Sequence, residues 1–157
     1  MSLVSPHSEF HICEQQHEYY LTLRVWVAYL EVRSNRGTLT SSIECVDDPD
    51  SRYYGRIVDR ASVDQVDWKS SEKMSSIPQY RWGVIVSYNM DQPVRGDGSC
   101  IFLHQWRGST NGTSGCTAMS PEDIEALVHW MNGQVRAVLV QLPEPEYERL
   151  RTHWQLP

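Results

Sequence analysis

Apolar and polar residues alternate most regularly over residues 19–32, YYLTLRVWVAYLEV. Leu21 and Leu23 fall on one face of an extended chain, and Thr22 and Arg24 fall on the other. Such alternation is typical of a strand with one buried face. This segment therefore predicts a strand, with a helix as the alternative.

Later strands are predicted by apolar runs. The segments 80–89 (YRWGVIVSYN) and 99–106 (SCIFLHQW) are rich in β-branched and aromatic residues, and 134–143 (QVRAVLVQLP) has the character of a last core strand. Asp-Pro and Gly interrupt residues 44–59, which we expect to form a loop. Residues 64–79 are expected to be a short irregular or helical crossing.

The clearest helix begins after Ser120. Serine is a favoured N-cap, Pro121 suits the first helical position, and acidic residues occupy the first turn. Apolar residues then recur at helical spacing and form one buried face: Ile124, Leu127, Val128 and Met131. Asn132 and Gly133 are expected to end this helix. With a short second helix in 144–157, the fold class is expected to be mainly β with a few helices (α+β).

Composition narrows the classes of function. The 157 residues suffice for one domain, and the net charge of −6 with scattered Lys and Arg predicts no binding to nucleic acid. No window is apolar enough to span a bilayer, and residues 1–20 lack the cationic start and apolar core of a secretory signal. The four cysteines are widely spaced without a CxxC pair, so we expect no metal site and no cofactor.

The segment 98–119 carries the residue types of a nucleophilic site. Period two puts Cys100, Phe102 and His104 on one face of the predicted strand, and His104 stands where that strand ends. A polar, glycine-rich run then leads to Cys116. Such a run can turn backbone N–H groups towards an oxyanion, and a neighbouring imidazole can accept a thiol proton. The alternative is a structural cysteine in a tight turn.

The blocks GSCIFLH (98–104) and TSGCTAMSPEDIEALVHWM (113–131) resemble the YkuD-type L,D-transpeptidase catalytic domain. They match the branch that reads G-S-x-I-F-L-H, then T-x-G-C, then a Ser-Pro-Glu helix start. Segments 44–59 and 80–89 match, in order, what precedes the motif in that branch. The resemblance covers residues 38–157, and it implies a small mixed sheet or β-sandwich with a helix after the catalytic cysteine.

By this resemblance, Cys116 is the nucleophile, His104 is its base, and Gly115 and Cys116 supply N–H groups to the oxyanion, with Thr113 and Ser114 in the same loop. The family acts on peptidoglycan stem peptides in the cell envelope or periplasm. The thiol attacks the carbonyl of an L-centre followed by a D-residue, and the terminal D-amino acid leaves. The thioester then passes to an amine or to water. The resemblance also implies that a carbapenem, a β-lactam, forms an adduct.

Two features depart from the family pattern. More familiar members read Ser-His-Gly-Cys with an arginine soon after, whereas residues 113–118 read Thr-Ser-Gly-Cys-Thr-Ala. The roles of that second histidine and that arginine are therefore not carried over. Residues 1–37 do not match the family's opening strands, which we expect to be missing or divergent. We therefore expect a divergent N-terminal segment, 1–37, and an L,D-transpeptidase-like catalytic domain, 38–157.

Further candidates for substrate contact lie in or beside the matched segments. Asp47 and Asp48 could bind an amine of the stem peptide, or they could be turn acids. The others are equally suited to packing, capping or an ordinary hydrogen bond: Ser99, Tyr54, Asn89 and Trp106. Cys45 and Cys100 could pair outside the cytoplasm, although wide spacing fixes no connectivity.

Three functions remain in competition. The leading hypothesis is a cysteine acyltransferase on peptidoglycan, working as an L,D-transpeptidase or an L,D-carboxypeptidase. The first alternative is a secreted toxin of the same fold that targets a rival's peptidoglycan. The second is a non-catalytic peptidoglycan-binding or structural domain, and the presence of both His104 and Cys116 argues against it.

Overall fold

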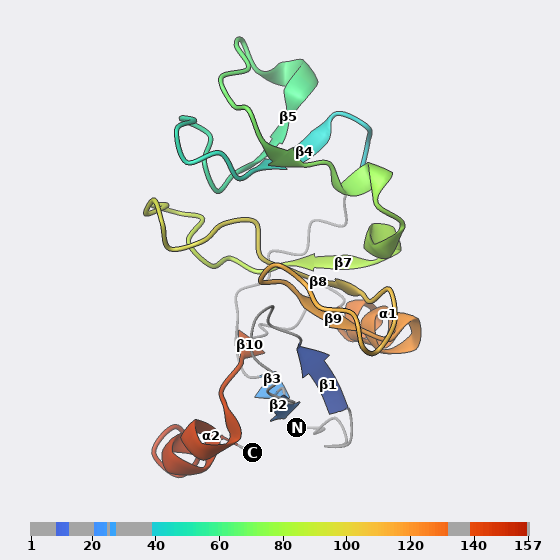
Figure 1. Cartoon of the computed structure of the whole chain (residues 1–157), viewed down its shortest axis with the longest axis vertical. Helices are drawn as coiled ribbons and strands as arrows, with labels where there is room; N and C mark the ends of the chain where they lie inside the picture. Colours follow the sequence, from blue (N-terminus) through green and yellow to red (C-terminus); the bar gives the residue numbers. More distant parts are fainter. Residues whose placement is uncertain (1–8, 13–20, 25, 28–38, 132–138, 157) are drawn as a thin grey trace.

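The computed structural model describes residues 9–12, 21–24, 26–27, 39–131 and 139–156. Strands and helices follow one another along these residues in a mixed α+β arrangement, which confirms the predicted fold class (Figure 1). The strands are β1 (Glu9–Ile12), β2 (Leu21–Arg24), β3 (Trp26–Val27), β4 (Ile43–Val46), β5 (Ile57–Asp59), β6 (Ser71–Glu72), β7 (Gly83–Ile85), β8 (Phe102–Gln105), β9 (Thr117–Met119) and β10 (Leu139–Val140). The helices are α1 (Pro121–Trp130) and α2 (Glu144–Leu150), and the 3-10 turns are η1 (Arg60–Ser62), η2 (Met74–Ser76) and η3 (Pro78–Arg81).

One three-stranded sheet has the order β5-β4-β6, and both of its strand pairs are antiparallel. Its central strand buries Cys45 and Val46 completely. The same strand buries Glu44, whose carboxylate accepts hydrogen bonds from Arg60, at 2.9 Å, and from Ser71. A buried carboxylate needs partners of this kind to offset the loss of its water shell.

The second three-stranded sheet, β7-β8-β9, carries the candidate site. Strand β7 is antiparallel to β8, whereas β9 is parallel to it, with Leu103 opposite Thr117 and His104 opposite Ala118. Extending this register by one residue places Cys116 beside Phe102. Directly opposed residues share a face, and so do residues two apart on one strand. The pairing therefore puts Cys116 on the same face as His104.

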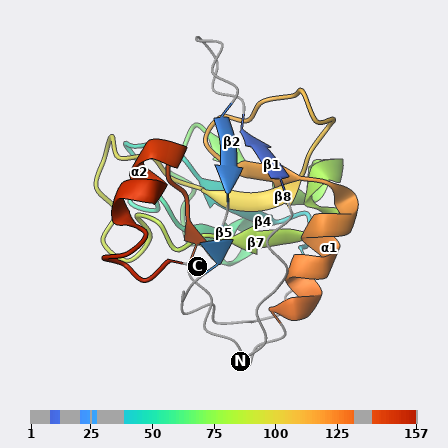
Figure 2. The same ribbon diagram turned by 90° about the horizontal axis from the view of Figure 1, so that it is seen from below.

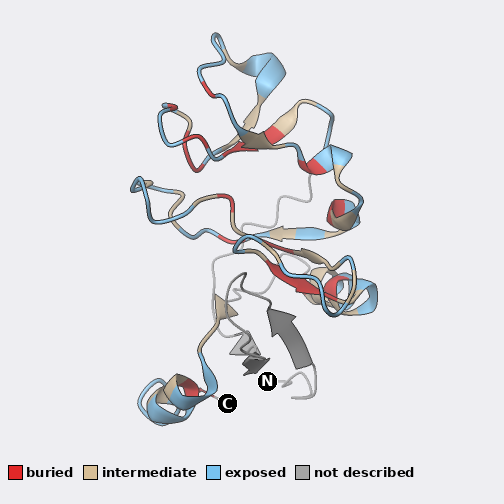
Figure 3. Ribbon diagram, viewed as in Figure 1, coloured by how far each residue is buried: buried red, intermediate tan, exposed pale blue. Residues whose placement is uncertain are grey.

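Strand β8 is packed on both faces, and buried residues gather along it in Figure 3. Towards the first sheet, one cluster contains Cys45, Met74, Tyr80, Cys100 and Phe102, with Cys116 packed against it. Towards α1, a second cluster contains Val86, Leu103, Met119 and Ile124. The period-two prediction for this strand is thus confirmed, since alternate residues enter different cores.

Helix α1 begins as the sequence predicts. The Ser120 hydroxyl accepts a hydrogen bond from the backbone N–H of Asp123 at 3.0 Å, and proline occupies the first turn. Ile124 is completely buried, while Leu127 and Val128 pack against the same cluster. The predicted apolar face is therefore confirmed. The predicted end at residues 132–133 lies outside the described residues.

Several predicted boundaries are wrong. Segment 44–59 is not a loop throughout, because it holds most of β4 and all of β5, and its Asp-Pro and Gly form the turn between them. The predicted strand 80–89 is reduced to β7, since η3 covers its first residues. The predicted strand 99–106 is reduced to β8, because Cys100 has a φ of 57° and cannot continue a strand. Strand β9 was not predicted.

The remaining strands form two separate pairs, one between consecutive strands and one between strands far apart in sequence. Strand β1 is antiparallel to β2, and β3 is antiparallel to β10. The strands predicted in 19–32 and 134–143 are confirmed at β2, β3 and β10, and residues 19–20, 25, 28–32 and 134–138 lie outside the described part. Helix α2 ends at Leu150, which confirms the short helix predicted in residues 144–157. Figure 2 shows α1 and α2 on opposite sides of the strands.

Candidate active site

The turn before β9 fixes the backbone around Cys116. Gly115 has a φ of 122°, in the left-handed region that favours glycine. An added Cβ there would lie 3.4 Å from the Cδ1 atom of Ile101. The Thr113 hydroxyl donates a hydrogen bond to the Cys116 carbonyl and closes the turn. Gly115 and Ser114 are exposed, so the backbone next to the thiol is open to a ligand.

The thiol of Cys116 is half-buried and donates a hydrogen bond to the Cys100 carbonyl, with an Sγ–O distance of 3.6 Å. Burial raises the pKa of this thiol above its ordinary value, and the Glu72 carboxylate raises it further. A hydrogen bond from the backbone of Phe102 and the nearby Tyr80 hydroxyl lower the pKa, but they do not reverse the effect of burial. The thiol therefore needs a base to become a nucleophile at neutral pH.

The half-buried ring of His104 lies on the same sheet face as Cys116. Its Nδ1 lies 2.7 Å from the backbone carbonyl oxygen of Gln105, and a carbonyl can only accept. The hydrogen of a neutral ring is therefore on Nδ1, which leaves the lone pair of Nε2 to take a proton. The ring centroids of His104 and Tyr80 are 4.9 Å apart. Cys116 packs against the buried cluster that contains the same tyrosine, so Tyr80 adjoins both members of the candidate pair.

Tyr80 and Glu72 are residues of this site that sequence reasoning missed. Tyr80 belongs to η3 and Glu72 to β6, and the Tyr80 hydroxyl donates a hydrogen bond to Oε1 of Glu72 at 2.5 Å. Pro78 was the only local sign that a turn, and not a strand, holds the tyrosine. No spacing rule relates Glu72 to Cys116, so tertiary packing alone brings them together.

A disulfide joins the two sheets behind the thiol. Cys45 of β4 is bonded to Cys100, with a Cα–Cα distance of 5.8 Å. This is the pairing that the sequence left open. Because the carbonyl that receives the Cys116 thiol belongs to Cys100, the disulfide anchors one wall of the candidate site.

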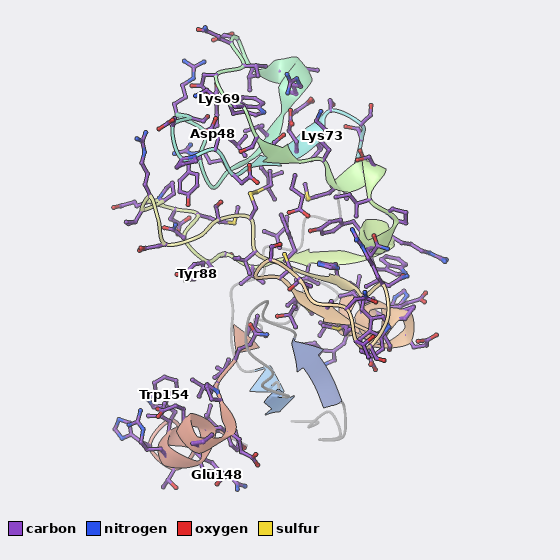
Figure 4. All side chains as sticks on the ribbon, in the orientation of Figure 1. Asp48, Lys69, Lys73, Tyr88, Glu148 and Trp154 are labelled. Atoms are coloured by element: carbon purple, nitrogen blue, oxygen red, sulfur yellow. A yellow bond between two sulfur atoms is a disulfide. The ribbon has the colours of Figure 1, made fainter. Side chains whose placement is uncertain are left out.

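Asp47 and Asp48 have different surroundings. Asp48 is buried, and its carboxylate accepts hydrogen bonds from the backbone N–H of Lys69, at 2.6 Å, and of Asp50, at 3.0 Å. These bonds hold its pKa below the ordinary value. Figure 4 shows Asp48 and Lys69 together at the turn after β4. Asp48 thus acts as a turn acid, whereas Asp47 is exposed.

Asn89 closes the loop that precedes β8. It has a φ of 51°, and its side-chain nitrogen donates to the carbonyls of Val94 and Gly98 at 2.9 and 2.7 Å. Its side-chain oxygen accepts from the Val94 N–H at 2.7 Å. All of these bonds lie within residues 89–98, so the contacts of Asn89 are those of a loop cap.

Among the described residues, the other candidates make no hydrogen bond or ring contact with the thiol of Cys116 or the imidazole of His104. Tyr54 is buried in the turn between β4 and β5, and Ser99 is half-buried one residue before Cys100. Trp106 is half-buried, and its backbone N–H donates to the Met119 carbonyl at 2.8 Å, which extends the pairing of β8 with β9. Substrate contact by any of these residues stays a prediction.

In the part of the chain that the structure describes, no group of three or more His, Cys, Asp or Glu side chains is arranged to hold a metal ion. None of the helices in that part has the length and apolar character needed to cross a membrane.

Comparison with known proteins identifies the family. A family model described as the L,D-transpeptidase catalytic domain, YkuD, matches residues 30–140, well over half of the chain. Neither the curated proteins nor the solved structures gave a match. The matched range contains both three-stranded sheets, α1 and the Cys116–His104 pair. YkuD domains are L,D-transpeptidase enzymes that act on peptidoglycan in the cell envelope. The chain therefore belongs to the YkuD family of L,D-transpeptidase catalytic domains.

Proposed function

We propose that this protein is a cysteine acyltransferase of peptidoglycan stem peptides, with Cys116 as nucleophile and His104 as base. The observation that carries the proposal is the shared face of β8 and β9, on which both side chains lie, together with the bond from His104 Nδ1 to the Gln105 carbonyl. That bond leaves Nε2 available for the thiol proton. Residues 38–157 form the catalytic unit, and residues 1–37 are a divergent addition to it.

In the first half of the reaction, Nε2 of His104 takes the proton of the Cys116 thiol. The thiolate then attacks the carbonyl of the L-centre, and the developing oxyanion receives backbone N–H groups of Gly115 and Cys116. The tetrahedral intermediate collapses as the C–N bond breaks, and the imidazolium gives its proton to the leaving D-amino acid. A thioester on Cys116 remains.

In the second half, an amine or water attacks the thioester, with Nε2 of His104 taking its proton. The C–S bond breaks and the proton returns to the sulfur. An amine acceptor gives a cross-link or an exchanged D-residue, and water gives a shortened stem. The exposed turn at Ser114 and Gly115 leaves room for either acceptor.

The disulfide supports action in the cell envelope. Disulfides persist in oxidising compartments and are rare where thiols are kept reduced. The bond between Cys45 and Cys100 therefore fits an oxidising compartment, and the Cys100 carbonyl accepts the hydrogen bond of the Cys116 thiol. Exposed Asp47 is the better placed of the two adjacent aspartates for a substrate amine, since Asp48 is engaged by backbone N–H groups.

The test is incubation with disaccharide tetrapeptides, with and without a free D-amino acid, followed by mass spectrometry. Loss of the terminal residue, or its exchange for the added one, is the expected result. Cys116→Ser should abolish both products, and the matched control Cys13→Ser should retain them. Turnover that survives in Cys116→Ser would overturn the proposal.

A further inference from the structure

Tyr80 occupies the centre of the site yet belongs to neither catalytic strand. Its side chain is buried, its ring packs edge-on against Phe102 with a centroid distance of 5.5 Å, and its other ring neighbour is His104 at 4.9 Å. Its hydroxyl donates to Glu72 at 2.5 Å, and Cys116 packs against the buried cluster that contains Tyr80. Two aromatic contacts and a held hydroxyl leave this ring little freedom.

A tyrosine hydroxyl has one hydrogen and can therefore donate to only one partner at a time. In the structure that partner is Glu72, while the Cys116 thiol donates to the Cys100 carbonyl. When the thiol loses its proton, the sulfur becomes a second acceptor, packed against the cluster to which Tyr80 belongs. The hydroxyl then faces two anions, the Glu72 carboxylate and the thiolate, and a hydrogen bond to either is about twice as strong as one between neutral groups.

We propose that Tyr80 is a positioning residue for the Cys116–His104 pair, with a hydroxyl that donates to Glu72 in the resting enzyme and to the Cys116 thiolate after deprotonation. This inference rests on the proposed function and deepens it. Tyr80 keeps its proton throughout, because the thiol proton goes to His104. When the C–S bond forms, the hydroxyl returns to Glu72.

Glu72 disfavours the Cys116 thiolate, whereas the Tyr80 hydroxyl favours it. The half-buried carboxylate of Glu72 holds the tyrosine hydroxyl away from sulfur and repels a negative charge there, and it raises the pKa of the Cys116 thiol. The Tyr80 hydroxyl lowers that pKa. These two side chains, with His104 on the same sheet face, are the titratable groups that face the thiol from β6, η3 and β8.

The proposal therefore predicts opposite effects from two conservative changes. Tyr80→Phe keeps the ring contacts and removes the hydroxyl, so the thiolate loses a donor. Glu72→Gln removes the negative charge and releases the hydroxyl, so the thiolate is favoured. If Tyr80 and Glu72 had a purely structural role, both substitutions would change the reactivity of Cys116 in the same direction.

The experiment measures the rate of alkylation of Cys116 by iodoacetamide from pH 6 to 10, with the modified peptide identified by mass. We expect the apparent pKa of the thiol to rise by about one unit in Tyr80→Phe and to fall by about one unit in Glu72→Gln. The alkylation rate at neutral pH should therefore be roughly tenfold lower in Tyr80→Phe and roughly tenfold higher in Glu72→Gln. Tyr80→Phe should also lower kcat on the tetrapeptide with KM nearly unchanged.

Matched controls are available on the same chain. Tyr53→Phe removes the hydroxyl of a tyrosine whose ring also packs edge-on, against Trp68 at 5.4 Å. Glu148→Gln removes an exposed carboxylate on α2, which Figure 4 labels at the far end of the molecule from η3. Both should leave the pH profile of Cys116 where it is.

The outcomes separate the two proposals. Suppose that Cys116 is reactive but that the pH profile of its alkylation matches the controls in both variants, or shifts in the same direction in both. That result overturns the role of Tyr80 and leaves the proposed function standing. A Cys116 that neither alkylates nor turns over overturns both. If Tyr80→Phe melts well below the wild type, the test rests on Glu72→Gln alone. A slower or unchanged rate of Cys116 alkylation at neutral pH in that variant then refutes the inference.

Discussion

Removal of the Cys45–Cys100 disulfide should markedly destabilise the protein. The bond spans 55 residues of sequence and ties β4 to the segment before β8. Cross-linking reduces the entropy of the unfolded chain, and a loop of this length corresponds to about 4 kcal/mol at 25 °C. The change is Cys45→Ala with Cys100→Ala, and alanine leaves no unpaired polar group in the buried cluster.

Urea denaturation followed by tryptophan fluorescence measures the effect. With a slope of about 2 kcal/mol/M, the transition midpoint should fall by roughly 2 M. Wild type in reductant should match the double variant, and reductant should not shift the double variant further. Alkylation of Cys116 should also change, since the Cys100 carbonyl that receives its thiol loses its anchor. Equal midpoints for oxidised wild type and the double variant would show that this bond does not constrain the unfolded chain.

Further predictions concern the base, the core, acid stability and the nucleophile. His104→Ala should lower turnover by about 10² to 10⁴, the usual effect of losing a positioned base, and near-full activity would remove it from the mechanism. Ile124→Ala, at a completely buried position, should lower the free energy of unfolding by about 2–5 kcal/mol in the same urea assay. Burial acts to raise the pKa of Glu44, but hydrogen bonds from Ser71 and Arg60 outweigh it and lower that pKa below 4.5. Its contribution to stability should therefore be complete above the unfolded value and vanish as the pH falls through the folded value, so wild type and Glu44→Gln should converge in acid. A carbapenem should add the mass of one drug to the peptide containing Cys116 and none to Cys116→Ser; a folded protein without an adduct would contradict a reactive thiol.

The helix was predictable because its signals are local, and the candidate catalytic pair was proposed from signals that are equally local. Ser120, Pro121 and the apolar positions after them are an N-cap, a first-turn residue and a 3.6-residue period, all within a few turns of chain. His104 and Cys116 stand in two short blocks with a recognisable order, and the glycine before the cysteine meets a backbone requirement that only its neighbours impose. Roles in catalysis for these two residues remain predictions.

Other elements were not predictable, because their stabilising partners are remote. Strand β9 has three residues and no pattern of its own, and it exists through parallel pairing with β8. The loop predicted at 44–59 hid β4, whose residues extend because β5 and β6 pair with its two edges. Short strands are stabilised by such pairing more than by intrinsic preference.

The sequence by itself determined the family, the position of the nucleophile candidate and the periodic faces of β8 and α1, since each depends on residue order over a short span. Only the tertiary structure decided that Glu72 and Tyr80 meet Cys116 and that Cys45 bonds Cys100. The physical reason is that a hydrogen bond or a disulfide depends on distance in space, and chain spacing does not limit which distant residues the packing of two sheets brings together.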